Sequence, residues 1–300
     1  MVTPEEIAEA ARLIRNGQLV AFPTETVYGL GANAFDRSAV RRIFELKGRP
    51  QTSPLIVHVA SIEMAKSLVE CWPEQAETLA RKHWPGPLTL VLPKRARIPE
   101  EVTAGLATVG VRAPAHPAAL ELIRAAGVPI AAPSANRFTE LSPTTAEHVR
   151  RAFGNAVLVL DGGPTEVGIE STVVSLAGPE PLLLRPGMIP FEDIPRVTAV
   201  DAAAHPSPGM HPRHYSPRTR LVLVDGPELP GGDGAYVWWN RPAKAAKSVQ
   251  MPSNARGYAA RLYDTLHALD SEDWPWIAVE RPPSTPEWAG IQDRLERASQ

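Results

Sequence analysis

Two cations and a serine lie close together in the sequence, at Lys47-Gly48-Arg49-Pro50 and Ser53. A Lys and an Arg two residues apart could converge on the phosphates of a nucleotide, where each charge-assisted hydrogen bond contributes about 1.5–3 kcal/mol. The same residues also fit an ordinary helix end, with Lys in the last turn, Gly directly after it and Pro beyond. The sequence has no Walker A motif, so a phosphate site here would not be of the P-loop kind.

Further polar side chains follow apolar runs that are typical of buried strands. Ser134 and Asn136 come directly after the run 129–132, and Arg112 and Arg185 each close another such run. Ligands of α/β proteins bind in crevices at the carboxyl ends of strands, so these side chains could surround one crevice. Together with the two cations above, they would suit a ligand that carries several negative charges.

A glycine-rich segment, Gly29-Leu-Gly31-Ala-Asn-Ala34, follows the first predicted strand and fits the loose dinucleotide-binding pattern. That interpretation also needs an acidic residue at the end of the next strand, but the run 55–59 is followed by Ala-Ser. A turn that needs positive φ is the structural alternative. We favour a third interpretation, in which the glycines let a ligand approach closely beside the polar residues Thr24, Glu25, Thr26 and Tyr28.

The histidines give no clear catalytic or metal-binding pattern. His58 lies inside the apolar run 55–59, where a lone histidine is more often a hydrogen-bonded core residue. His211 and His214 stand in a proline-rich stretch without an acidic partner, and no nucleophile motif such as G-x-S-x-G occurs. We therefore expect no metal held by the protein itself. Mg²⁺ could instead arrive on a nucleotide, which needs few protein ligands.

These residues fall in a pattern of mixed helices and strands. Thr3, Pro4 and Glu6 fit the N-cap, first position and capping-box acid of a helix, and Asp36 opens another helix that closes at Lys47. Further helices are predicted near 62–70, 74–83, 117–126 and 146–153, and strands near 19–22, 55–59, 88–92, 108–112, 129–132, 157–160, 171–176 and 181–184. This order predicts an α/β domain with a partly parallel sheet.

The pattern breaks after residue 187, and a smaller α/β pattern follows. Residues 205–217 (HPSPGMHPRHYSP) contain four prolines and three histidines without periodicity, which indicates an extended segment. Because this segment also carries Arg213, His214 and Tyr215, we expect a lid over the nucleotide site; a plain tether is the alternative. Beyond it, strands are predicted near 221–224, 235–239 and 276–279, and helices near 255–269 and 288–298. The domains are thus predicted as 1–200, a proline-rich linker 201–219, and a C-terminal α/β domain 220–300.

Composition limits the classes of function. The 300 residues carry 31 Lys and Arg against 33 Asp and Glu, a formal net charge of −2. A protein that mainly coats nucleic acid would carry a basic excess. The single cysteine, Cys71, excludes an internal disulfide and any site with several cysteine ligands. The apolar runs are shorter than about 18 residues and the N-terminus does not fit a secretory signal, so we expect a cytoplasmic protein without membrane spans.

Seven motifs together resemble one known family. They are PTETVYGLG (Pro23–Gly31), KGRP (Lys47–Pro50), SPLIVHV (Ser53–Val59), PGPLT (Pro85–Thr89), VGVR (Val109–Arg112), APSAN (Ala132–Asn136) and ESTVV (Glu170–Val174). In this order, and with HYSP at His214–Pro217, they are similar to the YrdC-type L-threonylcarbamoyladenylate synthases in their long, two-domain form. The resemblance implies a YrdC-like twisted open α/β sheet domain followed by a smaller Rossmann-like α/β domain.

The resemblance also implies an activity. Members of the family are nucleotidyltransferases that make L-threonylcarbamoyl-AMP and pyrophosphate from L-threonine, bicarbonate and ATP, with Mg²⁺ on the ATP. The product serves threonylcarbamoyladenosine modification of tRNA next to the anticodon, so downstream transfer proteins are expected partners and tRNA is a further candidate. A non-catalytic RNA-binding protein of the same fold is the alternative; it would release no pyrophosphate.

Residue roles follow from the resemblance, position by position. Lys47 and Arg49 correspond to the family's cationic pair at the nucleotide and are the expected catalytic residues. The full expected ATP-binding set is Lys47, Arg49, Ser53, Thr108, Ser134, Asn136, Ser142, Arg185 and Tyr215. The expected L-threonine-binding set is Thr26, His58, Arg112, Ala132 and Ser171.

Overall fold

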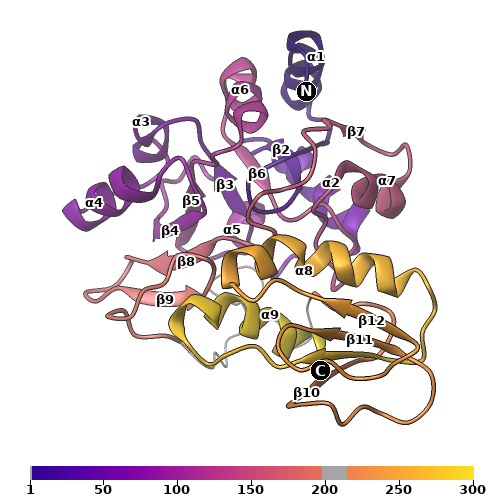
Figure 1. Ribbon diagram of the computed structural model, residues 1–300. Helices are drawn as coiled ribbons and strands as arrows, with labels where there is room; N and C mark the ends of the chain where they lie inside the picture. The colour runs from indigo at the N-terminus through magenta and orange to yellow at the C-terminus, as the bar shows by residue number, and fades with distance from the viewer. Residues whose placement is uncertain (1, 198–214) are drawn as a thin grey trace.

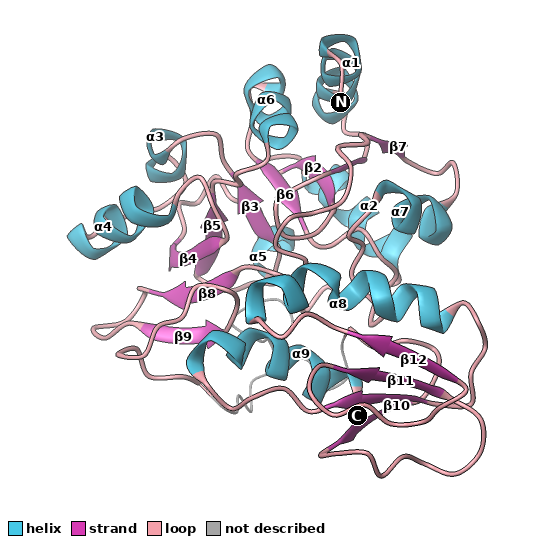
Figure 2. Cartoon of the chain, in the orientation of Figure 1, coloured by secondary structure: helices cyan, strands magenta, loops and turns pink. Residues whose placement is uncertain are grey.

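The computed structural model describes residues 2–197 and 215–300. It contains two sheets that differ in size and in strand direction, a nine-stranded mixed sheet and a four-stranded parallel sheet. Figure 1 shows the large sheet surrounded by the N-terminal helices, with the small sheet below it and the last two long helices beside that sheet. Figure 2 shows the same alternation of helices and strands by type. The expected α/β class, with a second and smaller parallel-sheet domain, is confirmed.

The large sheet has the strand order β7-β1-β2-β6-β3-β5-β4-β8-β9. Parallel pairs join β1 to β7, β3 to β5 and β4 to β8, and the other neighbours are antiparallel, so the sheet is partly parallel as predicted. Its strands are β1 (Val20–Phe22), β2 (Gly29–Asn33), β3 (Ile56–His58), β4 (Leu88–Pro93), β5 (Thr108–Arg112), β6 (Ile130–Ala132), β7 (Leu158–Val159), β8 (Thr172–Ser175) and β9 (Leu182–Arg185).

Most helices around this sheet begin and end where local sequence signals predict, but the helix predicted near 62–70 ends at Lys66, and α5 was not predicted. The Thr3 hydroxyl and the Glu6 carboxylate complete a capping box at the start of α1, and Asp36 caps α2. Gly48 ends α2 in the left-handed region, at φ 63°. The helices are α1 (Pro4–Arg15), α2 (Arg37–Lys47), α3 (Ile62–Lys66), α4 (Glu74–His83), α5 (Glu100–Thr103), α6 (Pro117–Ala126) and α7 (Ala146–Phe153). The helix-end interpretation of Lys47-Gly48 is therefore correct.

The turn considered as the structural alternative for the glycine-rich segment is wrong, because Gly29 and Gly31 lie inside strand β2. A Cβ at Gly31 would lie 2.7 Å from Ile130 Cγ2 and 2.8 Å from Phe22 Cε1. Close packing between neighbouring strands and an aromatic ring therefore explains this glycine, and neither a turn nor a dinucleotide loop is needed.

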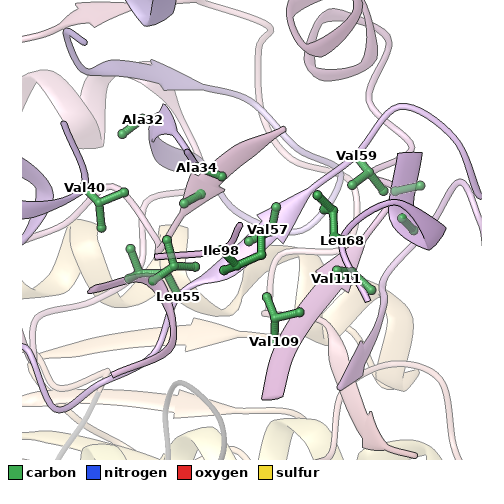
Figure 3. Close-up of a cluster of buried hydrophobic side chains, with 14 of the residues drawn as sticks. Ala32, Ala34, Val40, Leu55, Val57, Val59, Leu68, Ile98, Val109 and Val111 are labelled. Atoms are coloured by element: carbon green, nitrogen blue, oxygen red, sulfur yellow. The ribbon is translucent and has the colours of Figure 1, made fainter. Parts of the chain in front are cut away.

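The hydrophobic core continues from the large sheet into the C-terminal part. Figure 3 shows one cluster, in which side chains such as Val57, Val109 and Val111 meet between strands and helices. A second cluster joins Ile169 of the large domain to Leu262 of the C-terminal domain. Because apolar side chains of both domains share one cluster, the two domains pack directly against each other.

The small sheet has the order β10-β13-β11-β12 and is parallel throughout. Its elements are β10 (Leu221–Val224), β11 (Ala235–Trp238), β12 (Lys247–Gln250), α8 (Ala255–Asp270), β13 (Ile277–Glu280), the 3₁₀ turn η1 (Pro286–Trp288) and α9 (Ala289–Ala298). Strand β12 was not predicted, because it is a mostly exposed edge strand with one apolar residue in the sequence KSVQ.

The domain boundaries at 200/201 and 219/220 stay a prediction, since residues 198–214 lie outside the described part of the chain. The segment 205–214 of the expected lid also falls there. No helix among residues 2–197 and 215–300 is both long and apolar enough to cross a membrane.

Candidate active site

A cavity lies where the ends of several strands of the large sheet meet residues 170, 185 and 215. Eight of the residues expected from the sequence line its wall: Thr26, Arg49, His58, Arg112, Ala132, Ser134, Arg185 and Tyr215. Its other lining residues are Thr24, Val27, Gly29, Ile56, Pro133 and Glu170. The cavity volume is about 50 Å³, well below the ~300–1,000 Å³ of typical ligand pockets. A nucleotide does not fit into this volume, so the walls must separate to admit one.

Sheet register brings the polar residues of the central strands together. β3 and β5 run parallel with His58 opposite Arg112, and β6 lies on the other side of β3 with Ala132 opposite Ile56. Residues opposite each other in neighbouring strands lie about 5 Å apart. The sheet thus places the imidazole and the guanidinium side by side at one edge of the cavity.

Arg112 is held by the buried carboxylate of Glu25, a residue expected beside the ligand but not as an ion-pair partner. Its Nη2 lies 2.6 Å from Glu25 Oε1, and its Nε donates to the backbone oxygen of Gly86 at 3.3 Å. Glu25 Oε2 in turn accepts a hydrogen bond from the backbone N–H of Ala115 at 2.9 Å. This pair fixes the guanidinium in the cavity wall and compensates its charge.

Arg49 is buried but lacks such a carboxylate partner. Its Nη2 donates to the backbone oxygen of Pro54 at 3.2 Å, and its Nε has no hydrogen-bond partner in the described structure. Burial, reinforced by the nearby charge of Arg185, lowers the pKa of Arg49 to about 10. A buried cation with an unused N–H is suited to a ligand that brings its own negative charge.

Lys47 does not point into the cavity, although it lies only two residues from Arg49. Its Nζ donates to the backbone oxygen of Ser134 at 2.7 Å and also to that of Asn136. Burial, with a smaller effect of Arg49, lowers the pKa of Lys47 well below its usual value. In this conformation Lys47 anchors the turn 133–136 from behind, and Ser134 faces the cavity from that turn. A direct contact of Lys47 with phosphate stays a prediction.

The histidine of the site is neutral at physiological pH. Burial and the charge of Arg112 lower the pKa of His58 to about 3, and its Nδ1 has no hydrogen-bond partner among the described residues. The Thr26 hydroxyl is also buried and lies 2.8 Å from the Thr24 hydroxyl, with which it forms one hydrogen bond. These groups could recognise an amine or a hydroxyl without adding charge.

Besides Lys47, five expected residues lie outside the cavity wall: Ser53, Thr108, Asn136, Ser142 and Ser171. Ser142 and Ser171 are fully buried directly behind it. The Ser142 hydroxyl donates to Glu170 Oε1 at 2.5 Å, and the Ser171 hydroxyl lies 3.1 Å from Arg185 Nη2. Asn136 Nδ2 donates to the backbone oxygens of residues 137 and 140, at 2.7 and 2.9 Å.

Thr108 begins strand β5, whereas Arg112 ends it. At about 3.3 Å per residue, their Cα atoms lie roughly 13 Å apart. Ser53 follows helix α2 in a turn, where its backbone N–H donates to the oxygen of Pro50 at 3.2 Å. Contacts of Ser53 and Thr108 with ATP stay predictions.

Comparison with known proteins shows where the chain belongs. The family model described as "Telomere recombination", of the Sua5, YciO and YrdC proteins, matches residues 12–187, and the model described as "Threonylcarbamoyl-AMP synthase, C-terminal domain" matches residues 189–300. A Threonylcarbamoyl-AMP synthase of Bacillus subtilis is 44% identical over 98% of this chain and 93% of its own length. The chain belongs to the threonylcarbamoyl-AMP synthase family.

Other relatives agree with this assignment. The Threonylcarbamoyl-AMP synthase of Pyrococcus abyssi is 52% identical over 74% of this chain and 68% of its own length. The crystal structure of P. abyssi Sua5 complexed with L-threonine superposes with a TM-score of 0.93 at 40% sequence identity, covering 100% of this chain and 95% of that one. The family resemblance expected from the seven motifs is confirmed over both domains.

Tyr215, the first residue described after the gap, closes one side of the site of this threonylcarbamoyl-AMP synthase family member. It is 1% exposed and has a left-handed backbone, with φ 61°. The next residue, Ser216, donates its backbone N–H to the oxygen of Thr139 at 2.9 Å. The end of the linker is therefore fixed to the loop that carries the expected nucleotide-binding residues, in agreement with a lid. The lid itself stays a prediction.

Sequence reasoning missed the ion pairs of three charged residues at the site. Glu25 was expected beside the ligand, but its pairing with Arg112 was not predicted, and Glu170 was given no role although it stands in the motif ESTVV. Arg294 reaches Glu170 from the last helix at 2.7 Å, and no local pattern marks it. Residues 2–197 and 215–300 contain no cluster of three or more His, Cys, Asp or Glu that could hold a metal ion.

Proposed function

We propose that this protein is a nucleotidyltransferase that makes L-threonylcarbamoyl-AMP and pyrophosphate from L-threonine, bicarbonate and ATP. The product serves threonylcarbamoyladenosine modification of tRNA next to the anticodon. The observation that carries the proposal is the cavity whose wall contains Arg49, Arg112 and Arg185 together with Thr26 and His58. Three buried cations match a polyanionic nucleotide together with a carboxylate, and the neutral polar groups match an amino acid with a hydroxyl.

The threonine end lies at strands β3 and β5. Arg112, fixed by Glu25, binds the carboxylate of threonine through a charge-assisted pair. His58 is neutral and the Thr26 hydroxyl is buried, so both can hydrogen-bond the amine or the hydroxyl of the substrate. Ala132, at the end of β6, lines the same part of the wall, and Ser171 lies behind it.

The part of the cavity that binds the nucleotide lies at Arg49, Arg185 and the turn 133–136, which Lys47 anchors. Fixed cations in a site closed to water stabilise the charge that develops on the phosphates during transfer. The carboxylates near the cavity are already paired, Glu25 with Arg112 and Glu170 with Arg294. Mg²⁺ therefore fits best as an ion carried by the ATP phosphates, which it would help to neutralise.

The chemistry proceeds in two steps. The amine of threonine and bicarbonate form a carbamate with loss of water. A carbamate oxygen then attacks the α-phosphorus of ATP, a new O–P bond forms, and the bond to the β-phosphate breaks so that pyrophosphate leaves. The carbamate is short-lived in water. A narrow cavity with Tyr215 in its wall would protect it from hydrolysis.

The product is a reactive mixed anhydride, so proteins that transfer the threonylcarbamoyl group to tRNA are the partners we propose, with tRNA itself as a further candidate. The cytoplasm, where ATP and tRNA occur together, is the proposed compartment.

Omitting one substrate at a time from a pyrophosphate-release assay tests this function. We expect release only when ATP, L-threonine and bicarbonate are all present. Release without threonine would mean a nucleotide hydrolase. No release at all, together with RNA binding, would favour the non-catalytic alternative.

A further inference from the structure

Arg294, in the last helix of the C-terminal domain, reaches the wall of the active site. Its side chain is fully buried, and its Nε donates to Glu170 Oε2 at 2.7 Å. Its Nη2 donates to the backbone oxygen of Glu170 at 3.2 Å and its Nη1 to that of Pro186 at 2.9 Å. Its guanidinium carbon also lies 5.2 Å from the ring centre of Tyr215. One C-terminal side chain thus contacts both Glu170 and Tyr215, which line the cavity.

Glu170 accepts hydrogen bonds from side chains in several parts of the chain. Besides Arg294, it accepts hydrogen bonds from the Ser142 hydroxyl at 2.5 Å and from the Tyr263 hydroxyl at 3.2 Å. Burial alone would raise the pKa of Glu170, but the charges of Arg294 and Arg185 outweigh it and lower the pKa. Glu170 is therefore an ionised carboxylate in the wall of a cavity that must accept the phosphates of ATP.

The backbone lets Arg294 approach this closely. A Cβ at Gly290, one turn earlier in α9, would lie 2.7 Å from the backbone oxygen of Gly187, so only glycine allows the helix to pack here. Arg294 Nη1 also lies 2.9 Å from a carboxylate oxygen of Asp293, the preceding residue of α9. Asp293 in turn binds Arg196 and Arg297. The guanidinium is therefore held in place from both domains.

The geometry points to Arg294 as a positioning residue for the ATP site: it neutralises Glu170 and holds this carboxylate, with Ser142 and Tyr215, in an arrangement that admits the nucleotide. The inference rests on the proposed function and goes beyond it, because it gives the C-terminal domain a part in ATP binding. Arg294 touches no reacting atom in this account. It acts through Glu170, whose free charge would repel the phosphates.

The test compares substitutions in the full-length protein, with KM measured separately for ATP and for L-threonine in the pyrophosphate assay. Arg294→Met removes the charge that faces Glu170. Arg297→Met is the matched control, because it changes the same residue type on the same helix and contacts Asp293 but not Glu170. Arg294→Lys keeps the charge and loses the forked geometry. The double variant Glu170→Gln, Arg294→Met removes both charges.

We expect Arg294→Met to raise KM for ATP at least about tenfold and KM for threonine less than about threefold, because ATP is a polyanion and threonine has no net charge. Arg294→Lys should fall between Arg294→Met and the wild type. The double variant should return KM for ATP to within about threefold of the wild type, and Arg297→Met should stay within about twofold.

Two results would overturn the inference. One is an unchanged KM for ATP in Arg294→Met. The other is an equal rise of both KM values that the double variant does not reverse, which would mean that Arg294 only supports packing. If Arg294→Met does not fold, the folded double variant decides by the same KM criterion. A wild-type protein that makes no product would instead refute the proposed function.

Discussion

Replacing Arg49 with Met should make the protein more stable and nearly inactive at the same time. Arg49 is buried, and among the described residues its Nε has no hydrogen-bond partner and its side chain donates only to the backbone oxygen of Pro54. Residues 2–197 and 215–300 therefore leave this charge without a compensating carboxylate, which suits a nucleotide that brings negative charge. A methionine of similar length removes the charge and keeps much of the packing.

The size of the gain follows from the pKa of Arg49. A fall from 12.5 to about 10 corresponds to about 3 kcal/mol of destabilisation of the charged form. The lost hydrogen bond to Pro54 offsets about 1 kcal/mol, and the lost contact with the ring of Phe138, 6.0 Å away, offsets about 0.5–1 kcal/mol. The free energy of unfolding without ligand should thus rise by about 1–2 kcal/mol. The loss of a charge-assisted contact to phosphate should lower kcat/KM by roughly tenfold to over a hundredfold.

Urea unfolding without ligands and pyrophosphate release give the two readouts. Arg12→Met is the control, because Arg12 is an exposed arginine paired with Glu9 on α1. It should change neither readout appreciably. A fall of more than about 1 kcal/mol in the unfolding free energy of Arg49→Met would show that Arg49 is structural and refute the reasoning. Unchanged kcat/KM in a folded variant would refute it equally.

Four other changes test separate contacts of the structure. Lys47→Met should lower the free energy of unfolding by about 1–3 kcal/mol, the opposite sign to Arg49→Met, because the turn 133–136 loses its anchor; urea unfolding measures it, and added stability would contradict it. The site should reject 2-aminobutyrate by about a hundredfold or more in kcat/KM, because buried groups that bind the threonine hydroxyl would be left unpaired; equal turnover in the pyrophosphate assay would refute a hydroxyl-reading pocket. Tyr215→Ala should weaken ATP binding and increase hydrolysis of the intermediate, with less effect on threonine binding; isothermal titration measures both affinities, and a fully active variant would reduce the segment to a tether. His148 and His267 stack at 3.9 Å between α7 and α8, and burial lowers the pKa of each to about 4. The unfolded chain therefore binds protons first as pH falls from about 6.5 to 4. Over that range the wild type should lose about 3 kcal/mol of stability per histidine, about 6 kcal/mol in all, relative to the variant with glutamine at both positions. Parallel stability curves for the two proteins would contradict this last prediction.

The sequence predicts helix ends well because their signals are local. A capping side chain lies within three residues of the N–H groups it binds, as at Thr3 and Asp36, and Gly48 ends α2 by its own backbone conformation. Gly31 is an ambiguous signal in the sequence, because a glycine can serve close packing as well as a turn, and only the positions of Phe22 and Ile130 decide between the two.

Charge pairs across the fold are harder to predict. Arg294 and Glu170 are 124 residues apart, and nothing near either residue marks the pair. Lys47 is difficult for a different reason. Its motif predicts a contact with the nucleotide, whereas its side chain binds backbone oxygens of the turn beside the cavity. Motifs thus locate the site, and the roles of single residues depend on side-chain directions that the fold sets.

The identity of the product tests the central claim most directly. The protein is incubated with ATP, L-threonine and ¹³C-labelled bicarbonate, and the products are analysed by mass spectrometry, with Arg49→Met in parallel. We expect threonylcarbamoyl-AMP that is heavier by the one labelled carbon, together with an equal amount of pyrophosphate, and far less of both from Arg49→Met. A nucleotide product without the label, or pyrophosphate formed without threonine, would contradict it.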